Sequence, residues 1–240
     1  MKAKERHELK QNEIAQFARR AMAWLEGNRS RAMTIAVAVL AVVVLVGGYA
    51  WWQQRTADQA GALLGMAGAI AQAPIAPAPT VAGATQQTGT FPSEAARLEA
   101  ALEAYRDVID GYPDSKAALS ARYAIANALL AAGRAAEAEE AFGAVVSAAG
   151  PSLQGSLGKL GRGQALAAQG KHEDAIALLT ELSADRESRL PLDGILIQLA
   201  RTSAKAGRTD DARAAFKRIV DEFPASTFAA EARQELARLG

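Results

Sequence analysis

Side chains suited to acid–base or metal chemistry are scarce in this sequence. It contains two histidines, His7 and His172, and no cysteine. The absence of cysteine removes thiolate nucleophiles, disulfides, Cys-type zinc sites and a lipoprotein anchor. A metal site or an acid–base dyad needs groups that converge at a defined spacing, and neither histidine has such neighbours. We expect His172, which follows Gly170, to be a solvated residue at the start of a helix.

The remaining candidates for chemistry also have structural explanations. Acidic pairs begin at Glu139, Glu173 and Asp210, near predicted helix starts, where carboxylates complement the helix dipole. The stretch GSLGKLGRGQ does not meet the GxxxxGK[ST] spacing of a phosphate loop, and no strand precedes it. The sequence therefore predicts a protein that is not an enzyme and that has no cofactor, metal or small-molecule substrate.

Residues 32–52 form an apolar run whose only ionisable side chain is the phenol of Tyr49. In a helix, at about 1.5 Å per residue, this run spans roughly 32 Å, which matches a hydrocarbon core about 30 Å thick. Trp51 and Trp52 end the run, as aromatic residues do at a membrane interface. A signal peptide has only about 7–15 apolar residues, and a buried core helix does not need so long a run. We therefore predict a retained transmembrane helix.

The charges that flank this run are one-sided. Residues 1–31 contain eight Lys or Arg residues and four Glu, whereas Arg55 is the only basic residue between Trp52 and Ser93. The positive-inside rule then predicts a cytoplasmic N-terminal tail, with the rest of the chain on the far side of the bilayer. Residues 93–240 hold 18 basic and 21 acidic residues, so we expect no nucleic-acid partner.

The tail also carries an apolar stripe at helical spacing. The stripe consists of Ile14, Phe17, Ala18, Ala21, Met22 and Leu25. Two interpretations stay open: an amphipathic helix that lies on inner-membrane lipids or on a membrane partner, and a short juxtamembrane helix that frays in solvent.

Two further segments follow the apolar run. Residues 53–73 have small and apolar residues at helical spacing, so the helix is predicted to continue beyond the membrane. Residues 74–92 are uncharged and rich in proline, which removes backbone donors, so a flexible linker is predicted there. As an alternative, residues 57–73 serve as the first helix of a helical pair that this loop interrupts.

Residues 93–240 contain an internal repeat of 37 residues. Four independent positions keep this period, and a period of this length with a helix–turn–helix pattern indicates a solenoid. The positions are Ala101, Ala138, Ala175 and Ala212; Tyr105, Phe142, Leu179 and Phe216; Gly133, Gly170 and Gly207; and Ala126, Gly163 and Ala200. The small residues allow close helix approach, and the glycines allow the left-handed backbone that ends a helix.

These positions resemble the tetratricopeptide repeat, in which a small residue, an alanine and an aromatic residue recur at the same offsets. The resemblance implies an all-α solenoid of helical hairpins. The predicted helices are 93–111, 115–132, 135–149, 152–169, 172–183, 190–206, 209–222 and 225–238. Helix 152–169 holds four glycines and is predicted to be either a soft point or a close crossing.

In that family the first helices line a concave groove that binds an extended peptide or a helix. Transferred position by position, the resemblance implies a partner-binding groove that pairs a polar ladder with apolar anchors. The residues are Ser120, Tyr123, Asn127, Leu157, Leu160, Gln164, Ile197, Arg201 and Lys205. We favour the groove for Asn127, Gln164 and Arg201, and the packed core for the aliphatic members.

A basic tail, one membrane helix and an external repeat domain are similar in layout to the bitopic ancillary subunit of the bacterial Sec translocon. This resemblance implies a scaffold in the inner membrane whose repeats, in the periplasm, assist protein export or folding together with chaperones. The alternative is a structural organiser of envelope assembly or cell division, which acts on outer-membrane or peptidoglycan machinery. A flexible linker at 74–92 favours the organiser, unless residues 57–73 pack into the solenoid.

Overall fold

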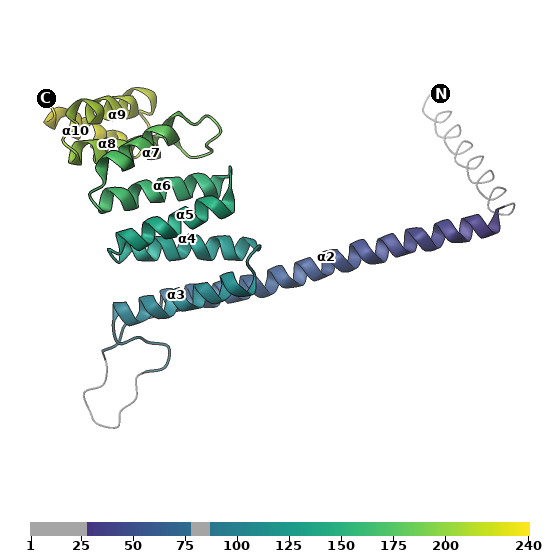
Figure 1. Ribbon diagram of the computed structural model, residues 1–240. Helices are drawn as coiled ribbons and strands as arrows, with labels where there is room; N and C mark the ends of the chain where they lie inside the picture. Colours follow the sequence, from purple (N-terminus) through teal and green to yellow (C-terminus); the bar gives the residue numbers. More distant parts are fainter. Residues whose placement is uncertain (1–27, 78–86) are drawn as a thin grey trace, which may run out of the picture. The chain divides into compact units, whose positions relative to one another are not determined.

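A computed structural model describes residues 28–77 and 87–240 (Figure 1). The chain divides into two compact units, Met1–Arg55 and Thr56–Gly240, and helix α2 (Arg29–Ala71) begins in the first and ends in the second. The apolar stripe of the tail lies outside the described residues, as does His7.

The described part of the first unit is an apolar helix with solvent-exposed side chains. Leu45 is 71% exposed and Trp51 is 62% exposed, and no part of the most apolar window of α2 is buried, so a buried core helix is excluded. The ring of Trp52 lies 6.2 Å from that of Tyr49, and the Arg55 guanidinium lies 5.4 Å from the centre of the Trp51 ring. Among the described helices, α2 alone is long and apolar enough to cross a membrane, a property that a signal sequence near an N-terminus shares.

The second unit is an all-α solenoid, as predicted. After the end of α2 come α3 (Glu94–Gly111), α4 (Lys116–Ala131), α5 (Ala135–Ala149), α6 (Leu153–Ala168), α7 (His172–Ala184), α8 (Leu192–Lys205), α9 (Thr209–Glu222) and α10 (Ala229–Arg238). From α3 to α10, each helix packs against the next along the chain.

These bounds lie within two residues of the predicted ones, apart from the start of α10. The prediction placed that start at residue 225, but residues 225–228 stay in a turn. In this turn Ser226 donates its amide to the Phe223 carbonyl at 2.9 Å, and its hydroxyl accepts the Phe228 amide at 3.1 Å. Serine competes for backbone groups in this way, which delays the helix.

Serines and glycines set the ends of most hairpin helices. The hydroxyls of Ser93, Ser115 and Ser152 accept the amide three residues on and so cap α3, α4 and α6. After α4, α6 and α8, the repeated glycines have positive φ, and the next amide donates to a carbonyl five residues back. The glycines are Gly133 (76°), Gly170 (79°) and Gly207 (75°).

The other repeated residues form the core, as the period predicts. Each second helix inserts a large side chain next to a buried alanine one turn earlier. Phe142 and Leu179 are fully buried, and Phe216 is 1% exposed. The partner alanines Ala138, Ala175 and Ala212 are fully buried as well.

The glycines of α6 mark a close crossing, one of the two predicted alternatives. A Cβ atom on Gly161 would lie 2.2 Å from the Phe142 ring, and one on Gly155 would lie 2.0 Å from the Gly150 carbonyl oxygen. At Gly163 it would lie 3.0 Å from Leu179. Bare backbone at these points lets α6 approach α5 and α7, so the glycines serve packing rather than flexibility.

The first hairpin joins the end of α2 to α3, as the alternative prediction proposed. Leu63, Leu64 and Ala67 lie in the same apolar cluster as Leu102 and Tyr105. The Tyr112 hydroxyl also bonds to the Gln59 side chain at 3.3 Å, and Arg97 donates to the Ala73 carbonyl at 3.1 Å. The segment between α2 and α3 is therefore a loop within a hairpin, not a spacer ahead of the solenoid.

The base of this loop is paired. The amide of Ala76 donates to the Phe91 carbonyl at 2.9 Å, and the Phe91 amide donates to the Pro74 carbonyl at 3.1 Å. This parallel bridge, Ile75 with Phe91, holds together the two ends of a segment that was predicted to have no regular element.

A ladder of ion pairs joins consecutive repeats. The basic residue after each repeated glycine bonds to an acidic residue in the preceding second helix: Arg134 to Glu99, and Arg208 to Glu173 at 2.7 Å. Both partners recur at the repeat period, since Glu99 and Glu173 lie two periods apart. Of these two acidic residues, Glu173 was attributed to the helix dipole alone, and the ladder adds a second role for it.

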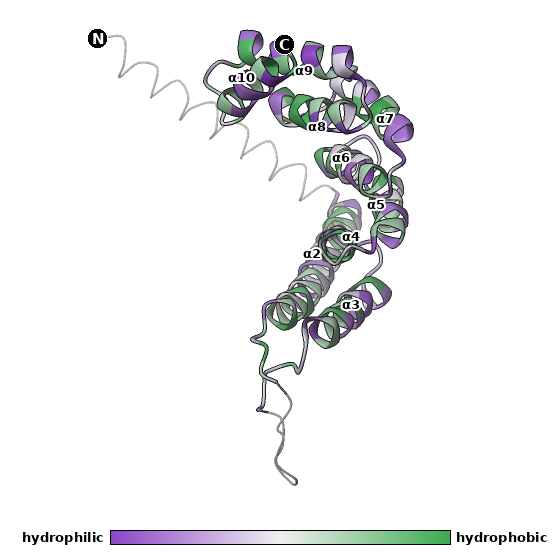
Figure 2. Cartoon of the chain, turned by 90° about the vertical axis from the view of Figure 1, so that its left-hand side faces the viewer, coloured by the Kyte–Doolittle hydropathy of each residue, from purple (hydrophilic) through white to green (hydrophobic). Residues whose placement is uncertain are grey.

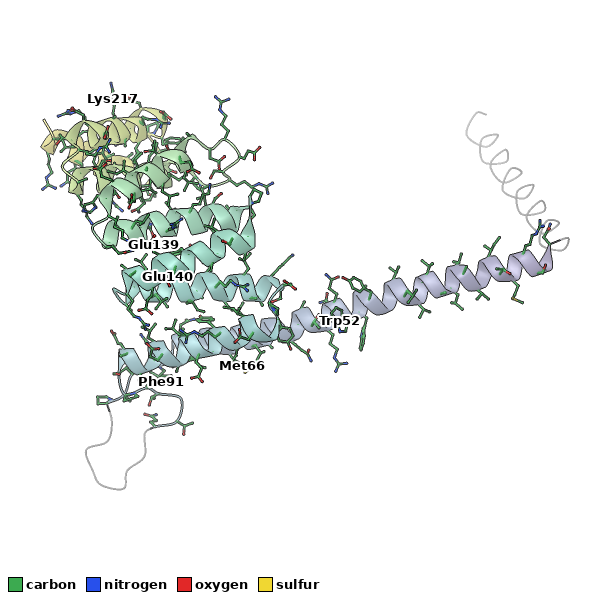
Figure 3. The ribbon with its side chains drawn as sticks, in the orientation of Figure 1. Trp52, Met66, Phe91, Glu139, Glu140 and Lys217 are labelled. Atoms are coloured by element: carbon green, nitrogen blue, oxygen red, sulfur yellow. The ribbon has the colours of Figure 1, made fainter. Side chains whose placement is uncertain are left out.

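The middle of the ladder is built differently, because the residue equivalent to Glu99 is Ala136. There Glu139 accepts hydrogen bonds from Gln169 at 2.9 Å and Lys171 at 3.1 Å, and Arg162 lies 3.4 Å away. The hydrogen bonds from Gln169 and Lys171 hold the pKa of Glu139 below its ordinary value. Figure 3 shows Glu139 on α5 beside Glu140, which has no bonded partner among the described residues.

We expect Gly161→Ala to lower the free energy of unfolding of the solenoid by about 2 kcal/mol, because the new methyl group collides with the Phe142 ring. Chemical denaturation of the full chain in detergent measures this change. The matched control is Gly143→Ala on α5, where a Cβ atom meets nothing within 4 Å and alanine favours the helix. Equal stability of the two variants would contradict the close crossing.

We expect Glu139→Gln to cost about 1 kcal/mol at neutral pH and to flatten the acid limb of the stability curve. The folded pKa of Glu139 is lowered from 4.5, so its contribution is present above that pH and is lost as the pH falls through the folded value. Thermal melts from about pH 5 to about pH 3 follow the loss. Glu140→Gln is the control, and an identical pH profile for both variants would argue against the role of Glu139.

Candidate functional site

The helices of the solenoid lie in two layers. The end of α2 and helices α4, α6, α8 and α10 lie on one side, and α3, α5, α7 and α9 lie on the other (Figure 2). Helix α4 contacts α6, and α6 contacts α8, whereas the described residues of the other layer make no comparable contacts between helices. The first helices are therefore closer together and form the inner side of the stack, where the resemblance places a partner groove.

The polar residues predicted for the groove all lie in this inner layer. Asn127, Gln164 and Arg201 occupy equivalent turns of α4, α6 and α8, at the repeat period. Asn127 is exposed and donates to the Tyr123 carbonyl at 2.8 Å, while Gln164 and Arg201 are half-buried. Ser120, early in α4, and Lys205, at the end of α8, are exposed as well. These side chains can reach a bound segment.

The apolar residues predicted for the groove differ in burial. Tyr123 is half-buried, with its ring edge-on to Phe142 at 6.0 Å, and Leu157 and Leu160 on α6 are half-buried. Ile197 is fully buried in the cluster formed by α8, α9 and α10, so its side chain has no surface to offer a partner. Half-buried Tyr123, Leu157 and Leu160 can both support the core and contact a ligand.

Arg201 is bound by the last helix. Its guanidinium donates to both carboxylate oxygens of Glu231 on α10, from Nε at 2.7 Å and from Nη2 at 2.6 Å. This two-point hydrogen bond lowers the pKa of Glu231 and raises that of Arg201. The pair joins two inner helices, and sequence reasoning missed it because Glu231 lies outside the recognised groove positions.

Charges are divided between the two layers. Apart from His172, helices α5 and α7 carry only acidic residues, whereas α4 and α6 carry only basic ones. Some of these charges pair across the layers, as Lys159 does with Glu181 at 3.1 Å. The inner layer is thus the more positive of the two.

The described residues contain no cluster of three His, Cys, Asp or Glu side chains that could hold a metal ion. A hollow of about 640 Å³ lies between α3 and α4 and is lined mainly by alanines, with Glu94, Arg97, Glu99 and Arg134 among its other lining residues. No arrangement of a nucleophile with a base is found among these lining residues.

The burial of His172 differs from the expectation of a solvated side chain. His172 begins α7, as predicted, but it is half-buried rather than solvated, and its Nδ1 atom is buried without a hydrogen-bond partner.

Comparison with known proteins agrees with this geometry. The tetratricopeptide repeat family model matches residues 166–239, less than half of the chain. No curated protein matches the chain. The matched region runs from the end of α6 to α10 and so includes two of the buried small–large pairs, Ala175 with Leu179 and Ala212 with Phe216. The repeat domain is therefore tetratricopeptide-like, a kind of domain that typically serves as a non-catalytic scaffold for protein–protein contacts.

Proposed function

We propose that this protein is a scaffold in a bacterial inner membrane that binds other proteins through the inner helices of its repeats. In this proposal the N-terminal tail is cytoplasmic, residues 32–52 cross the bilayer, and the repeats lie in the periplasm. There they assist the export or folding of envelope proteins at the Sec translocon together with periplasmic chaperones.

One observation carries the binding role: the inner layer presents accessible polar side chains next to half-buried apolar ones. Asn127, Gln164 and Lys205 offer hydrogen bonds or charge, and Tyr123 and Leu157 offer apolar surface. A groove of this composition suits an extended peptide or the apolar face of a helix. The proposed binding residues are Ser120, Tyr123, Asn127, Leu157, Leu160, Gln164, Arg201 and Lys205.

The anchor is supported by the exposed apolar surface of α2. Soluble proteins rarely expose a continuous apolar surface of this extent, so the side chains need a lipid or protein environment. The basic residues before the apolar run support the cytoplasmic orientation of the tail.

The alternative, an organiser of envelope assembly or cell division, drew its support from a flexible spacer between membrane and repeats. Because Leu63, Leu64 and Ala67 pack with α3, the proline-rich segment does not separate α2 from the solenoid. We therefore retain the export role.

Fractionation tests the anchor and its orientation. We expect the full-length product to remain with membranes after an alkaline carbonate wash, and the repeats to be cut by protease added to intact spheroplasts. A cytoplasmic protein that stays uncut is the control for spheroplast integrity. A shortened product in the soluble fraction, or repeats that are cut only after lysis, would contradict the proposal.

Photocrosslinking in intact membranes tests the groove. A photoreactive residue at Ser120 or Asn127 is expected to yield adducts with translocon subunits or chaperones. The same residue at Lys217, exposed on the outer helix α9 (Figure 3), should not yield them. Leu157→Glu should lower the yield from Asn127 roughly tenfold, since a charge would enter the apolar part of the groove. If adducts form equally from Lys217, the groove is not the binding surface. If the adducts contain neither translocon subunits nor chaperones, the export role is refuted.

A further inference from the structure

One side of the last turns of α2 is left uncovered by the rest of the described chain. This side, the α2 face, consists of exposed residues that are small or apolar: Gly61, Ala62, Gly65, Met66 and Ala69. Met66 is 57% exposed, and Figure 3 shows it on α2, pointing away from the stack. The sequence has no charged residue from Gln59 to Ser93, so the α2 face can be buried without removing a charge from water.

The two glycines of the α2 face have no role in the packing of this chain. A Cβ atom on Gly61 or Gly65 would meet nothing within 4 Å, whereas one on Gly161 of α6 would collide with the Phe142 ring. Neither α2 glycine has a positive φ, and both lie inside a helix, where glycine is less favourable than alanine. Close approach of a helix from outside the chain gives this bare backbone a purpose.

The opposite end of the inner layer is finished differently. The exposed residues of α10 include Arg233, Gln234 and Arg238, and a polar outer surface of this kind caps the end of a solenoid. The last turns of α2 form the other end of that layer, and their exposed side lacks such residues (Figure 2). The inner layer is therefore capped at α10 and uncapped at α2.

The shape of the α2 face is complementary to itself. Successive residues of a helix are about 100° apart, so Gly65 and Met66 lie on opposite flanks of the line through Ala62 and Ala69. When two such helices run parallel about a two-fold axis, each flank of one meets the opposite flank of the other. Met66 of one copy then lies over the bare backbone of Gly65 in the second copy, and the same contact occurs in reverse.

The size of the α2 face also restricts what can bind to it. From Gly61 to Ala69 the face is about 12 Å long, so it covers far less than the ~800 Å² per partner that stable complexes bury. A freely diffusing partner would not remain bound to so small a surface. A second copy anchored in the same membrane is held at a high effective concentration, and its α2 face follows the membrane crossing after the same number of residues.

We infer that the α2 face joins two copies of this chain as parallel neighbours, through Gly61, Gly65 and Met66. The inference rests on the proposed anchor, which brings the two copies together. It goes beyond the proposed function because each assembly then presents two partner grooves.

Cysteine crosslinking of the full-length protein in native membranes tests the inference, and the sequence contains no cysteine of its own. Ala62→Cys and Ala69→Cys each place one thiol on the middle line of the α2 face. Oxidation with copper phenanthroline should yield disulfide-linked homodimers, identified by mass and by co-purification of two differently tagged copies. Ala230→Cys is the matched control, because Ala230 is an exposed alanine on α10, and this variant should stay monomeric.

A second variant tests the close approach. Gly65→Leu fills the space that Met66 of the second copy needs, so it should lower the crosslinked fraction of Ala69→Cys roughly tenfold. The fold should be retained, because a Cβ atom at this position meets nothing within 4 Å, and thermal melts by circular dichroism verify it. Gly143→Leu, at an equally open glycine inside α5, should leave the crosslinked fraction unchanged.

The inference is overturned if neither cysteine yields a homodimer, if Ala230→Cys yields as much, or if the adducts contain only a different protein. A crosslinked fraction that Gly65→Leu leaves unchanged overturns it as well. In each case the proposed function still stands when the product stays in carbonate-washed membranes and Asn127 crosslinks to its partners. Loss of the product from the membrane contradicts the anchor and, with it, this inference.

Discussion

Close approach of helices at small residues is the constraint on which the solenoid depends. A large side chain from each second helix fills the space that a glycine or alanine leaves on its neighbour, as Phe142 does over Gly161 and Leu179 over Gly163. Because such contacts are dense and rigid, even one added methyl group must be accommodated by a shift of a helix. The small and large positions recur every 37 residues, so the stack extends by repetition.

Much of the solenoid could be predicted from the sequence, because the residues that end and begin its helices act locally. Glycine in a left-handed turn and serine at a helix start act within a few residues, and they placed most helix ends within two positions. The pairing of α2 with α3 was only one of two alternatives, since a loop of 22 residues hides the repeat. The link between Arg201 and Glu231 depends on how the last helix docks, and no local pattern reports that geometry.

Some positions of the solenoid depart from the repeat. Ser203 stands where the two preceding hairpins have Leu129 and Leu166, and it is fully buried with its hydroxyl unpaired. Ala136 replaces the acidic residue of the ladder, and Glu139 takes over with three donors. Ion pairs and side-chain hydrogen bonds along the stack thus join neighbouring hairpins. In the described inner layer, Arg162 and Lys159 on α6 and Arg201 on α8 are each engaged in such a pair.

The pairing of α2 with α3 also determines where the protein can be divided. The proline-rich loop resembles a natural boundary, and a fragment that begins after it would retain every helix from α3 onward. Such a fragment would leave Leu98, Leu102 and Tyr105 without the apolar surface that Leu63, Leu64 and Ala67 provide. A self-sufficient fragment of the repeats must therefore start upstream of the loop, near Thr56, and must carry the last turns of the helix that begins in the apolar segment.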